Sequence, residues 1–465
     1  MISFFRINDP FRLIPIFGLM IIMSAIYLWV LKIPLLQPEL TWMLLGKRLA
    51  EGKLMYRDVL DDSGPFSAGV YWLLHIIFDK SLWVYKISAG ILVFVQMIYL
   101  NNLFIKYKSF NEITYIPAFV ISVLVHLSFD IITLSPALMG GTFIVFALGQ
   151  LFSQTVLQKE GADSVLLLGI YGGIAACFHF PLIFFLPYML LAGIVVSGFT
   201  LRQFLLSIIG YAIPILICGV YFYWFDALPE FLNEYIFTSR SLEVYIHVSY
   251  QEILLLYSAP FVFAVLGMLF SAIFKSFNVN QQKQIQLMFI YLIFGATSIL
   301  LANRRAPYQW VVLIPGIAYF ISLLFISLKN GIILQALNIT FVILIPLVGF
   351  TWTFIKTNND DINSYGVYQT QQHQLTQGKK VLVLGTDIAY YRDAEQVTPY
   401  LNYHLSKLVL TELDDFESLA LAYKNFTNEI PEIVVDEEGL FENFLEKVPL
   451  LKAKYTKSGI YYTLN

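Results

Sequence analysis

Residues 13–31 read LIPIFGLMIIMSAIYLWVL, and residues 37–65 read QPELTWMLLGKRLAEGKLMYRDVLDDSGP. The first stretch carries no charged side chain and has the length of about 20 residues that crosses the hydrocarbon core of a bilayer. The second stretch is rich in charge, and apolar sequence follows it again. This alternation predicts a membrane helix followed by a loop at the membrane surface. Carboxylates held there suit a reaction at that surface, and they are equally common in a solvated loop.

The composition places the whole chain among helical membrane proteins. Hydrophobic residues make up 58% of the 465 residues and charged residues 13%, whereas soluble globular proteins carry about 25% charged residues. The 40 Phe and 29 Tyr suit lipid and its boundary with water. The apolar runs are continuous, which favours helices over a β-barrel. The net charge of −3 gives no reason to expect a nucleic-acid partner.

The two cysteines of the chain, Cys177 and Cys218, both lie inside apolar runs. They leave the external parts without a disulfide framework. We therefore expect neither thiol chemistry nor a cysteine-based metal site.

Apolar runs of sufficient length predict about eleven membrane spans. They lie at residues 13–33, 82–104, 115–130, 134–157, 164–179, 182–199, 203–225, 252–274, 285–302, 308–328 and 331–354. The run 66–78 is too short to span and follows Gly64 and Pro65. For this run we expect an amphipathic helix that lies at the membrane interface.

The distribution of lysine and arginine among the loops predicts the orientation of the chain. With the N-terminus inside, the cytoplasmic side receives Arg6, Arg12, Lys106, Lys108, Lys159, Arg202, Lys275, Lys283 and Lys329. The other side receives Glu39, Asp58, Asp61, Asp62, Asp130, Asp226, Glu230, Glu234 and Glu243, together with the basic residues Lys47, Arg48, Arg304 and Arg305. We therefore expect a protein of the bacterial cytoplasmic (inner) membrane with a cytoplasmic N-terminus. An odd number of spans then places the C-terminal part outside.

A change of composition at Lys356 marks the end of the membrane part. We predict a transmembrane domain over 1–355 with a first external loop at 34–81, a linker over 356–378 and an extracytoplasmic α/β domain over 379–465. In the last domain the sequence predicts strands at 380–385, 432–436 and 460–464 and helices at 415–425 and 438–447. No glycine-rich fingerprint continues from Gly385, which disfavours nucleotide binding.

Four segments carry a further pattern. Residues 38–66 contain an acid, a helical stretch, G-x-x-x-Y-x-D and G-P, leading into the short apolar run. Residues 134–138 read LSPAL, residues 172–181 read GGIAACFHFP, and residues 303–315 read NRRAPYQWVVLIP. Together these segments resemble the GT-C superfamily of polytopic glycosyltransferases, of the protein mannosyltransferase and aminoarabinose transferase type. The resemblance covers nearly the whole chain and implies an α-helical polytopic fold with a small external α/β domain.

The resemblance also implies a catalytic acid at the start of the first external loop. Many members carry an Asp-Glu pair there, whereas this chain reads Gln37, Pro38 and Glu39, so only Glu39 carries over. A carboxylate at the membrane surface can take the proton that an acceptor hydroxyl loses, and Glu39 is our candidate for this base. The alternative is an acid that stabilises a helix start through the helix dipole. Asp58 matches the Tyr-x-Asp position and is the second catalytic candidate.

The acids that follow are candidates for substrate binding. Asp61 and Asp62 suit acceptor hydroxyls or a divalent cation, since Mg²⁺ typically uses one or two carboxylates. A cation is thus compatible with the sequence without being implied, and no cofactor is expected. The alternative for each is a solvated loop acid before the Gly-Pro turn. Tyr56, two residues before Asp58, joins the substrate-binding candidates.

A departing lipid phosphate needs positive charge at the outer face. Arg304 and Arg305 can supply it, because a guanidinium binds phosphate through two parallel hydrogen bonds. An anchor pair for ordinary lipid head groups is the alternative. Tyr308 can stack on a sugar or belong to an aromatic belt. His179 and Arg240 are the last candidates, and a capping or packing role is the alternative for His179.

Three functions compete on the sequence alone. The first is a membrane glycosyltransferase that takes a sugar from a polyprenyl-phosphate donor and passes it to a glycan, lipid or protein acceptor at the outer face. The second is a transporter or flippase for a lipid-linked substrate, which the near absence of charge within the spans disfavours. The third is a non-catalytic scaffold whose external domain binds an envelope partner, which the missing Asp favours.

Overall fold

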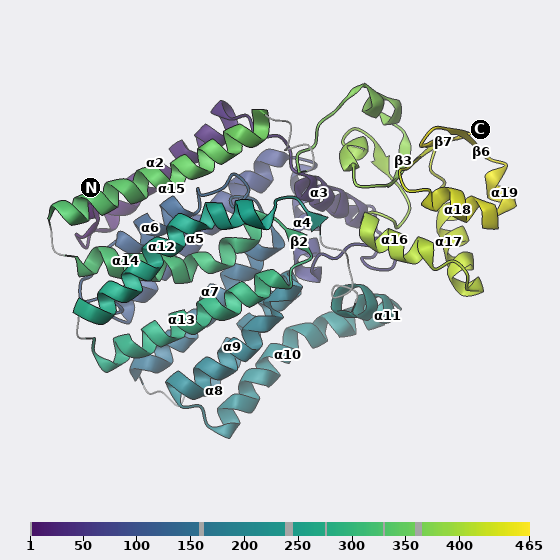
Figure 1. The fold of residues 1–465 in the computed structure, drawn as a ribbon. Coiled ribbons are helices and arrows are strands. Elements are labelled where there is room, and N and C mark those ends of the chain that lie inside the picture. The colour runs from purple at the N-terminus through teal and green to yellow at the C-terminus, as the bar shows by residue number, and fades with distance from the viewer. Residues whose placement is uncertain (1, 158–161, 238–244, 275–276, 329–330, 359–364) are drawn as a thin grey trace. The chain divides into compact units, whose positions relative to one another are not determined.

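The computed structural model describes residues 2–157, 162–237, 245–274, 277–328, 331–358 and 365–465. The chain divides into two compact units, and Figure 1 labels most of their helices and several of their strands. Unit 1 comprises Met1–Ile33, Tyr85–Cys218 and Val244–Asp361. Unit 2 comprises Pro34–Val84, Gly219–Glu243 and Ile362–Asn465.

Unit 1 is built from apolar helices, most of them long (Figure 1). Its α-helices are α1 (Ile2–Phe5), α2 (Leu13–Ala25), α5 (Leu82–Lys106), α6 (Ile116–Leu124), α7 (Pro136–Leu157), α8 (Ala162–Phe178), α9 (Phe185–Ala192), α10 (Leu201–Trp224), α12 (Tyr250–Phe274), α13 (Val279–Leu300), α14 (Ile314–Ser327) and α15 (Ile332–Asn358), of which α5 and α10 each extend at one end into unit 2. Shorter 3₁₀ and π turns are η1 (Pro10–Arg12), η2 (Ile26–Val30), η3 (Phe180–Phe184), η4 (Gly193–Ser197) and η7 (Pro307–Leu313). A pair of two-residue strands, β1 (Tyr245–Ile246) and β2 (Arg304–Arg305), runs parallel.

Within the described residues, nine helices are long and apolar enough to cross a membrane. They are Pro10–Val30, Leu82–Lys106, Pro136–Thr155, Phe180–Ser197, Leu201–Trp224, Tyr250–Ile273, Val279–Leu300, Pro307–Ser327 and Ile332–Asn358. The count of eleven is therefore not confirmed. In the predicted span 115–130 the helix α6 ends after 9 residues, and in 164–179 the described helix α8 has 17.

The difference at 115–130 has a physical reason. Every residue of α6 is buried against other helices of unit 1. A sequence that is apolar on all sides fits a buried core helix as well as a helix in lipid, and hydropathy alone does not separate the two. The helix α14 is buried almost as completely and packs against α6 and α12. A Cβ at Gly267 of α12 would lie 2.0 Å from the carbonyl oxygen of Phe320, so this close packing requires glycine.

Unit 2 contains a five-stranded sheet with the order β4-β3-β5-β7-β6. The strands are β3 (Lys380–Leu384), β4 (Glu395–Gln396), β5 (Ile433–Asp436), β6 (Tyr455–Ser458) and β7 (Tyr461–Leu464). β3 pairs in parallel with β4 and β5, whereas β7 is antiparallel to both β5 and β6. Three of these strands, β3, β5 and β7, are those that the sequence predicts.

The helices of unit 2 come from three separate parts of the chain. They are α3 (Gln37–Ala50), α4 (Pro65–Phe78), α11 (Leu228–Glu230), η5 (Phe231–Phe237), η9 (Gln371–Thr376), η10 (Ile388–Tyr391), α16 (Tyr403–Thr411), α17 (Phe416–Asn428), α18 (Leu440–Lys447) and α19 (Pro449–Lys452). The predicted helices at 66–78, 415–425 and 438–447 correspond to α4, α17 and α18. Helix α16 and the edge strand β6 were not predicted from the sequence; in β6 the polar residues Thr456, Lys457 and Ser458 give no buried-strand pattern.

The first loop is fastened to the C-terminal part within unit 2. The Leu60 N–H donates to the Pro399 carbonyl at 2.7 Å, and the Asn402 N–H donates to the Leu60 carbonyl at 3.1 Å. The Leu60 side chain joins the hydrophobic core of the C-terminal domain. Arg48 of α3 forms an ion pair with Glu429. The loop is therefore held by tertiary contacts on both sides of Asp58 and directly before Asp61.

Candidate functional site

Glu39 lies in the first turn of α3, where a helix start was expected. Pro38 occupies the second helical position, which suits a residue that has no N–H to donate. The Leu36 N–H donates to the Glu39 carboxylate at 3.1 Å. The side chain is completely buried. The Glu39 carboxylate therefore caps the start of α3, and this bond fixes its position.

Asp58 is engaged within its own turn. Its carboxylate accepts the Leu54 N–H at 2.9 Å and lies 3.1 Å from the Arg57 guanidinium. Burial alone would raise the pKa of Asp58, but the hydrogen bonds from Arg57 and Leu54 and the nearby positive charges outweigh it and lower the pKa. Asp58 is thus an ionised acid that orders the loop.

Asp61 and Asp62 are joined by a residue from the C-terminal part of unit 2. The Asn402 side-chain amide lies 3.4 Å from Asp61 Oδ1 and 3.2 Å from Asp62 Oδ1. The Ser63 N–H donates to Asp61 Oδ2 at 3.1 Å, and Asp61 is completely buried. Asn402 was missed by the sequence analysis, because nothing in its surroundings marks a partner 341 positions away.

The Tyr56 side chain is buried and packs against other aromatic rings. Its ring contacts Phe222, Phe231 and Tyr235, and its hydroxyl donates to the Ser63 carbonyl at 2.9 Å. Its φ of +70° lies in the left-handed region, which is uncommon for a residue with a side chain. The buried ring and the hydroxyl bond together hold this turn, so Tyr56 shapes the loop that carries Asp58 and Asp61.

Glu234 is a further acid near Asp61 that the sequence analysis recorded only as an external charge. It lies in η5 of unit 2, one turn after Glu230. Burial raises the pKa of Glu234 well above its ordinary value, and the charges of Glu230 and Asp61 raise it further. The carboxyl is therefore biased towards its neutral, hydrogen-bond-donating form.

Replacing Glu234 with Gln is expected to stabilise the protein at neutral pH and to change little in acid. The ordinary pKa is about 4.5, and the folded-state pKa is higher. Folding therefore loses stability as the pH rises from the unfolded-state pKa to the folded-state pKa, by about 1.4 kcal/mol per unit of difference. Melting temperatures of both proteins between about pH 4 and pH 8 check this. A difference that stays constant across that range would contradict it.

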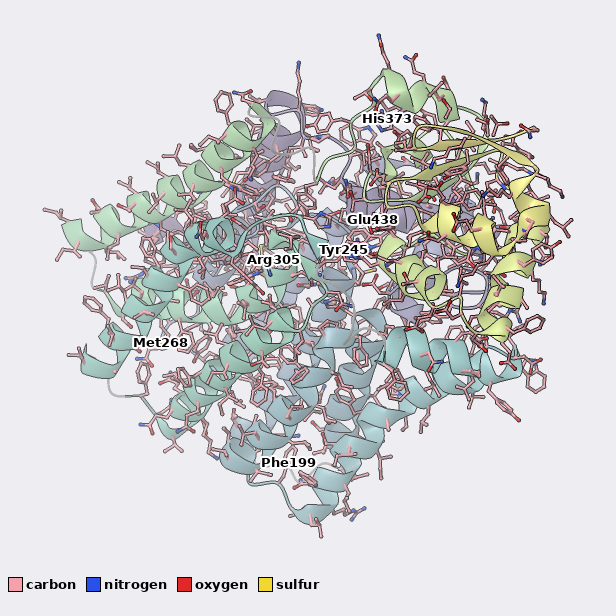
Figure 2. All side chains as sticks on the ribbon, turned by 45° about the vertical axis from the view of Figure 1, so that its right-hand side comes forward. Phe199, Tyr245, Met268, Arg305, His373 and Glu438 are labelled. Carbon is pink, nitrogen blue, oxygen red and sulfur yellow. The ribbon has the colours of Figure 1, made fainter. Side chains whose placement is uncertain are left out.

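Arg304 and Arg305 form the strand β2 of unit 1. β2 pairs with β1, so Tyr245 lies opposite Arg304. The Arg304 guanidinium lies 4.6 Å from the centre of the Tyr245 ring, and the Arg305 guanidinium lies 3.6 Å from that of Tyr250. Figure 2 shows Tyr245 and Arg305 near each other. The stacking orients both cations, and neither tyrosine was identified from the sequence.

Tyr308 and Asp130 are joined across unit 1. The backbone N–H of Tyr308 donates to Asp130 Oδ2 at 3.0 Å, and the Ser128 hydroxyl donates to Asp130 Oδ1 at 2.6 Å. Both Asp130 and Tyr308 are almost completely buried. A buried carboxylate among membrane helices is costly, and the two hydrogen bonds offset part of this cost. Asp130 thereby fixes the segment that directly follows the two arginines.

Two candidates remain. His179 follows α8 and precedes η3, and its N–H donates to the Ala175 carbonyl at 2.9 Å, as a residue that ends a helix does. Arg240 lies outside the described residues. In the described part of the chain, no three His, Cys, Asp or Glu side chains are arranged to hold a metal ion.

The helices of unit 1 define a polytopic helical membrane protein, and comparison with known proteins identifies its fold. No family model and no curated protein matches the sequence. Among solved structures, ArnT from Cupriavidus metallidurans, bound to undecaprenyl phosphate, is similar with a TM-score of 0.56 and 8% identity over 98% of this chain and 98% of that one. An archaeal oligosaccharyltransferase, AglB from Archaeoglobus fulgidus, in complex with an inhibitory peptide and a dolichol-phosphate, is similar with a TM-score of 0.48. It is 13% identical over 98% of this chain and 75% of that one. The likeness to ArnT confirms the GT-C fold that the sequence predicts.

Proposed function

We propose that the chain is a membrane glycosyltransferase that moves a sugar from a polyprenyl-phosphate donor to an envelope acceptor. The observation that carries the proposal is the likeness of fold to ArnT over 98% of both chains, since that protein was solved with undecaprenyl phosphate bound. The proposed site is at the outer face of the bacterial inner membrane. The acids of the first loop, in unit 2, and the stacked arginines, in unit 1, are each proposed for a separate role in this transfer.

Glu39 is the proposed base of this reaction. An acceptor hydroxyl oxygen forms a bond to the anomeric carbon of the sugar while the bond from that carbon to the phosphate oxygen breaks. The acceptor proton passes to the Glu39 carboxylate, and the polyprenyl phosphate leaves with the bonding electrons. The Leu36 N–H fixes the carboxylate for this step, because a positioned base is far more effective than a free one.

Asp61 and Asp62 are the proposed ligands of acceptor hydroxyls. Asn402 holds both side chains, so a hydroxyl-bearing acceptor meets acids of fixed position rather than mobile loop residues. Glu234 adds a carboxyl that is biased towards the neutral form and can donate a hydrogen bond. Donors and acceptors side by side match the paired hydroxyls of a sugar or glycan.

Arg304 and Arg305 are the proposed ligands of the donor phosphate. The tyrosine rings contact the guanidinium groups and fix their orientation. Arginine held in this way loses little freedom when its planar fork binds a phosphate. The acids and the arginines belong to different units, so each role has its own test.

The proposed function requires the C-terminal part to lie outside. A phosphatase reporter that is active only in the extracytoplasmic space, fused after Asn465, is expected to be active in cells. A fusion at the same residue with a reporter that works only in the cytoplasm is expected to be inactive. An inactive phosphatase fusion together with an active cytoplasmic reporter would contradict the predicted extracytoplasmic position of the C-terminal part.

Profiling of lipid-linked sugars and envelope glycans in a deletion strain tests the function in the cell. We expect one envelope glycan or lipid to lose a sugar and the corresponding polyprenyl-phosphate sugar to accumulate. A plasmid copy of the wild type should restore the profile, and a Glu39→Gln copy should not. An unchanged profile in the deletion strain would count against the enzyme.

A further inference from the structure

The two cysteines of the chain lie against each other. Cys177 belongs to α8 and Cys218 to α10, and their Sγ atoms are 3.8 Å apart. They are 2% and 4% exposed. A buried residue touches about 6–12 others, so two cysteines placed at random in 465 positions would meet in roughly 2% of cases. A chance encounter is therefore a poor explanation of this contact.

Small residues bring α8 and α10 together just before the cysteines. Residues at intervals of four lie along one face of a helix. Gly169, Gly173 and Cys177 are spaced in this way on α8, as are Gly210, Pro214 and Cys218 on α10. A Cβ added to Gly169 would lie 3.0 Å from Gly210 Cα, and one added to Gly173 would lie 2.9 Å from Pro214 Cδ. The two helices run parallel in register here, with each cysteine one turn beyond the last close approach.

We propose that Cys177 and Cys218 form a reversible disulfide when a membrane-soluble oxidant of the quinone class reaches them. The Sγ–Sγ bond forms, both S–H bonds break, and two protons and two electrons pass to the quinone, which becomes the quinol. A disulfide joins Cα atoms about 4.4–6.8 Å apart, and helices in contact through glycine come this close. The sulfurs then reach bonding distance by a small movement of the two side chains.

Burial selects the kind of oxidant. Both thiols are covered, so a protein that exchanges disulfides cannot reach them, whereas a small apolar two-electron oxidant dissolves in the surrounding lipid. Thiol chemistry was not expected from the sequence, because a separation of 41 positions does not indicate a contact. The disulfide would tie α8 to α10 and close the intervening chain into a loop, which restricts the unfolded state.

The test uses the purified wild-type protein in lipid nanodiscs, first reduced and then treated with a short-chain ubiquinone. After denaturation the remaining thiols are labelled with a maleimide and counted by intact mass. We expect two labels on the reduced protein and none on the oxidised one, one quinol formed per protein, and a cross-linked peptide that holds both cysteines. The melting temperature should rise on oxidation and return on reduction.

Two controls make the outcome decisive. Cys177→Ser and Cys218→Ser should each keep one label after quinone treatment and show no rise in melting temperature. In a Cys218→Ala, Gly219→Cys double variant the second thiol moves about 100° around α10, and it should not cross-link. The proposal is overturned if the oxidised wild type still takes two labels. It is equally overturned if the single variants lose their label, since the loss would then not need the pair.

Discussion

Purified Glu39→Gln protein is expected to insert and fold like the wild type and to transfer sugar about 10²–10⁴-fold more slowly, because a positioned proton acceptor is typically worth that much. The amide keeps the volume of the side chain and an oxygen that can accept the Leu36 N–H, so the start of α3 is retained. Only the proton acceptor is lost. Initial rates of transfer, with melting temperature as the measure of folding, check this.

Glu51→Gln is the matched control for this variant. Glu51 is an exposed acid at the other end of the same helix, where it pairs with Lys47 and Arg48. The same change of carboxylate to amide there should leave the rate within about twofold of the wild type, as expected of a surface ion pair. Near-normal transfer by Glu39→Gln would instead move the role of the base to Asp58 or Asp61, or end the enzyme proposal.

Arg304→Ala and Arg305→Ala are each expected to weaken binding of a polyprenyl-phosphate sugar by roughly 10–150-fold. This range corresponds to the loss of a hydrogen bond to a charged group, about 1.5–3 kcal/mol. Binding of an acceptor should change far less. Arg→Lys at either position should restore only part of the affinity, because the ammonium keeps the charge and loses the fork. Titration of the purified variants with the donor measures the effect.

Arg12→Ala is the control for the loss of a stacked arginine in unit 1. The Arg12 guanidinium lies 3.6 Å from the centre of the Phe4 ring, as close as that of Arg305 to Tyr250. Its replacement should leave donor affinity unchanged, which separates loss of a phosphate ligand from loss of an aromatic stack. Equal donor affinities for the wild type and for both variants at 304 and 305 would refute the phosphate assignment but not the fold.

The fold could be predicted where the local pattern is strong. The long uncharged run at 13–31 predicts a membrane helix, and the short apolar runs of β3 and β5 predict buried strands. The prediction of a span at 115–130 was not confirmed. The apolar side chains of the short helix α6 are buried against neighbouring helices, and the prediction had assigned them to lipid. Hydropathy measures the need for burial and does not say what covers the helix.

The partners of the candidate residues could not be predicted from the sequence. Asn402 reaches Asp61 and Asp62 from a distant part of the chain, and the Tyr308 N–H meets Asp130 across 178 positions. Such pairs depend on tertiary packing, to which no local pattern corresponds. The acids themselves were visible in the sequence, whereas the groups that position them appear only in the fold.

The most direct test of the proposed glycosyltransferase uses purified wild-type protein, a panel of polyprenyl-phosphate sugars labelled in the sugar, and the envelope lipids and glycans of the deletion strain as acceptors. For one donor we expect label to appear in an acceptor and free polyprenyl phosphate to be released in equal amount, with both products formed about 10²–10⁴-fold more slowly by Glu39→Gln protein. Binding of a donor without any transfer or release by folded wild-type protein, across the whole panel, would contradict it.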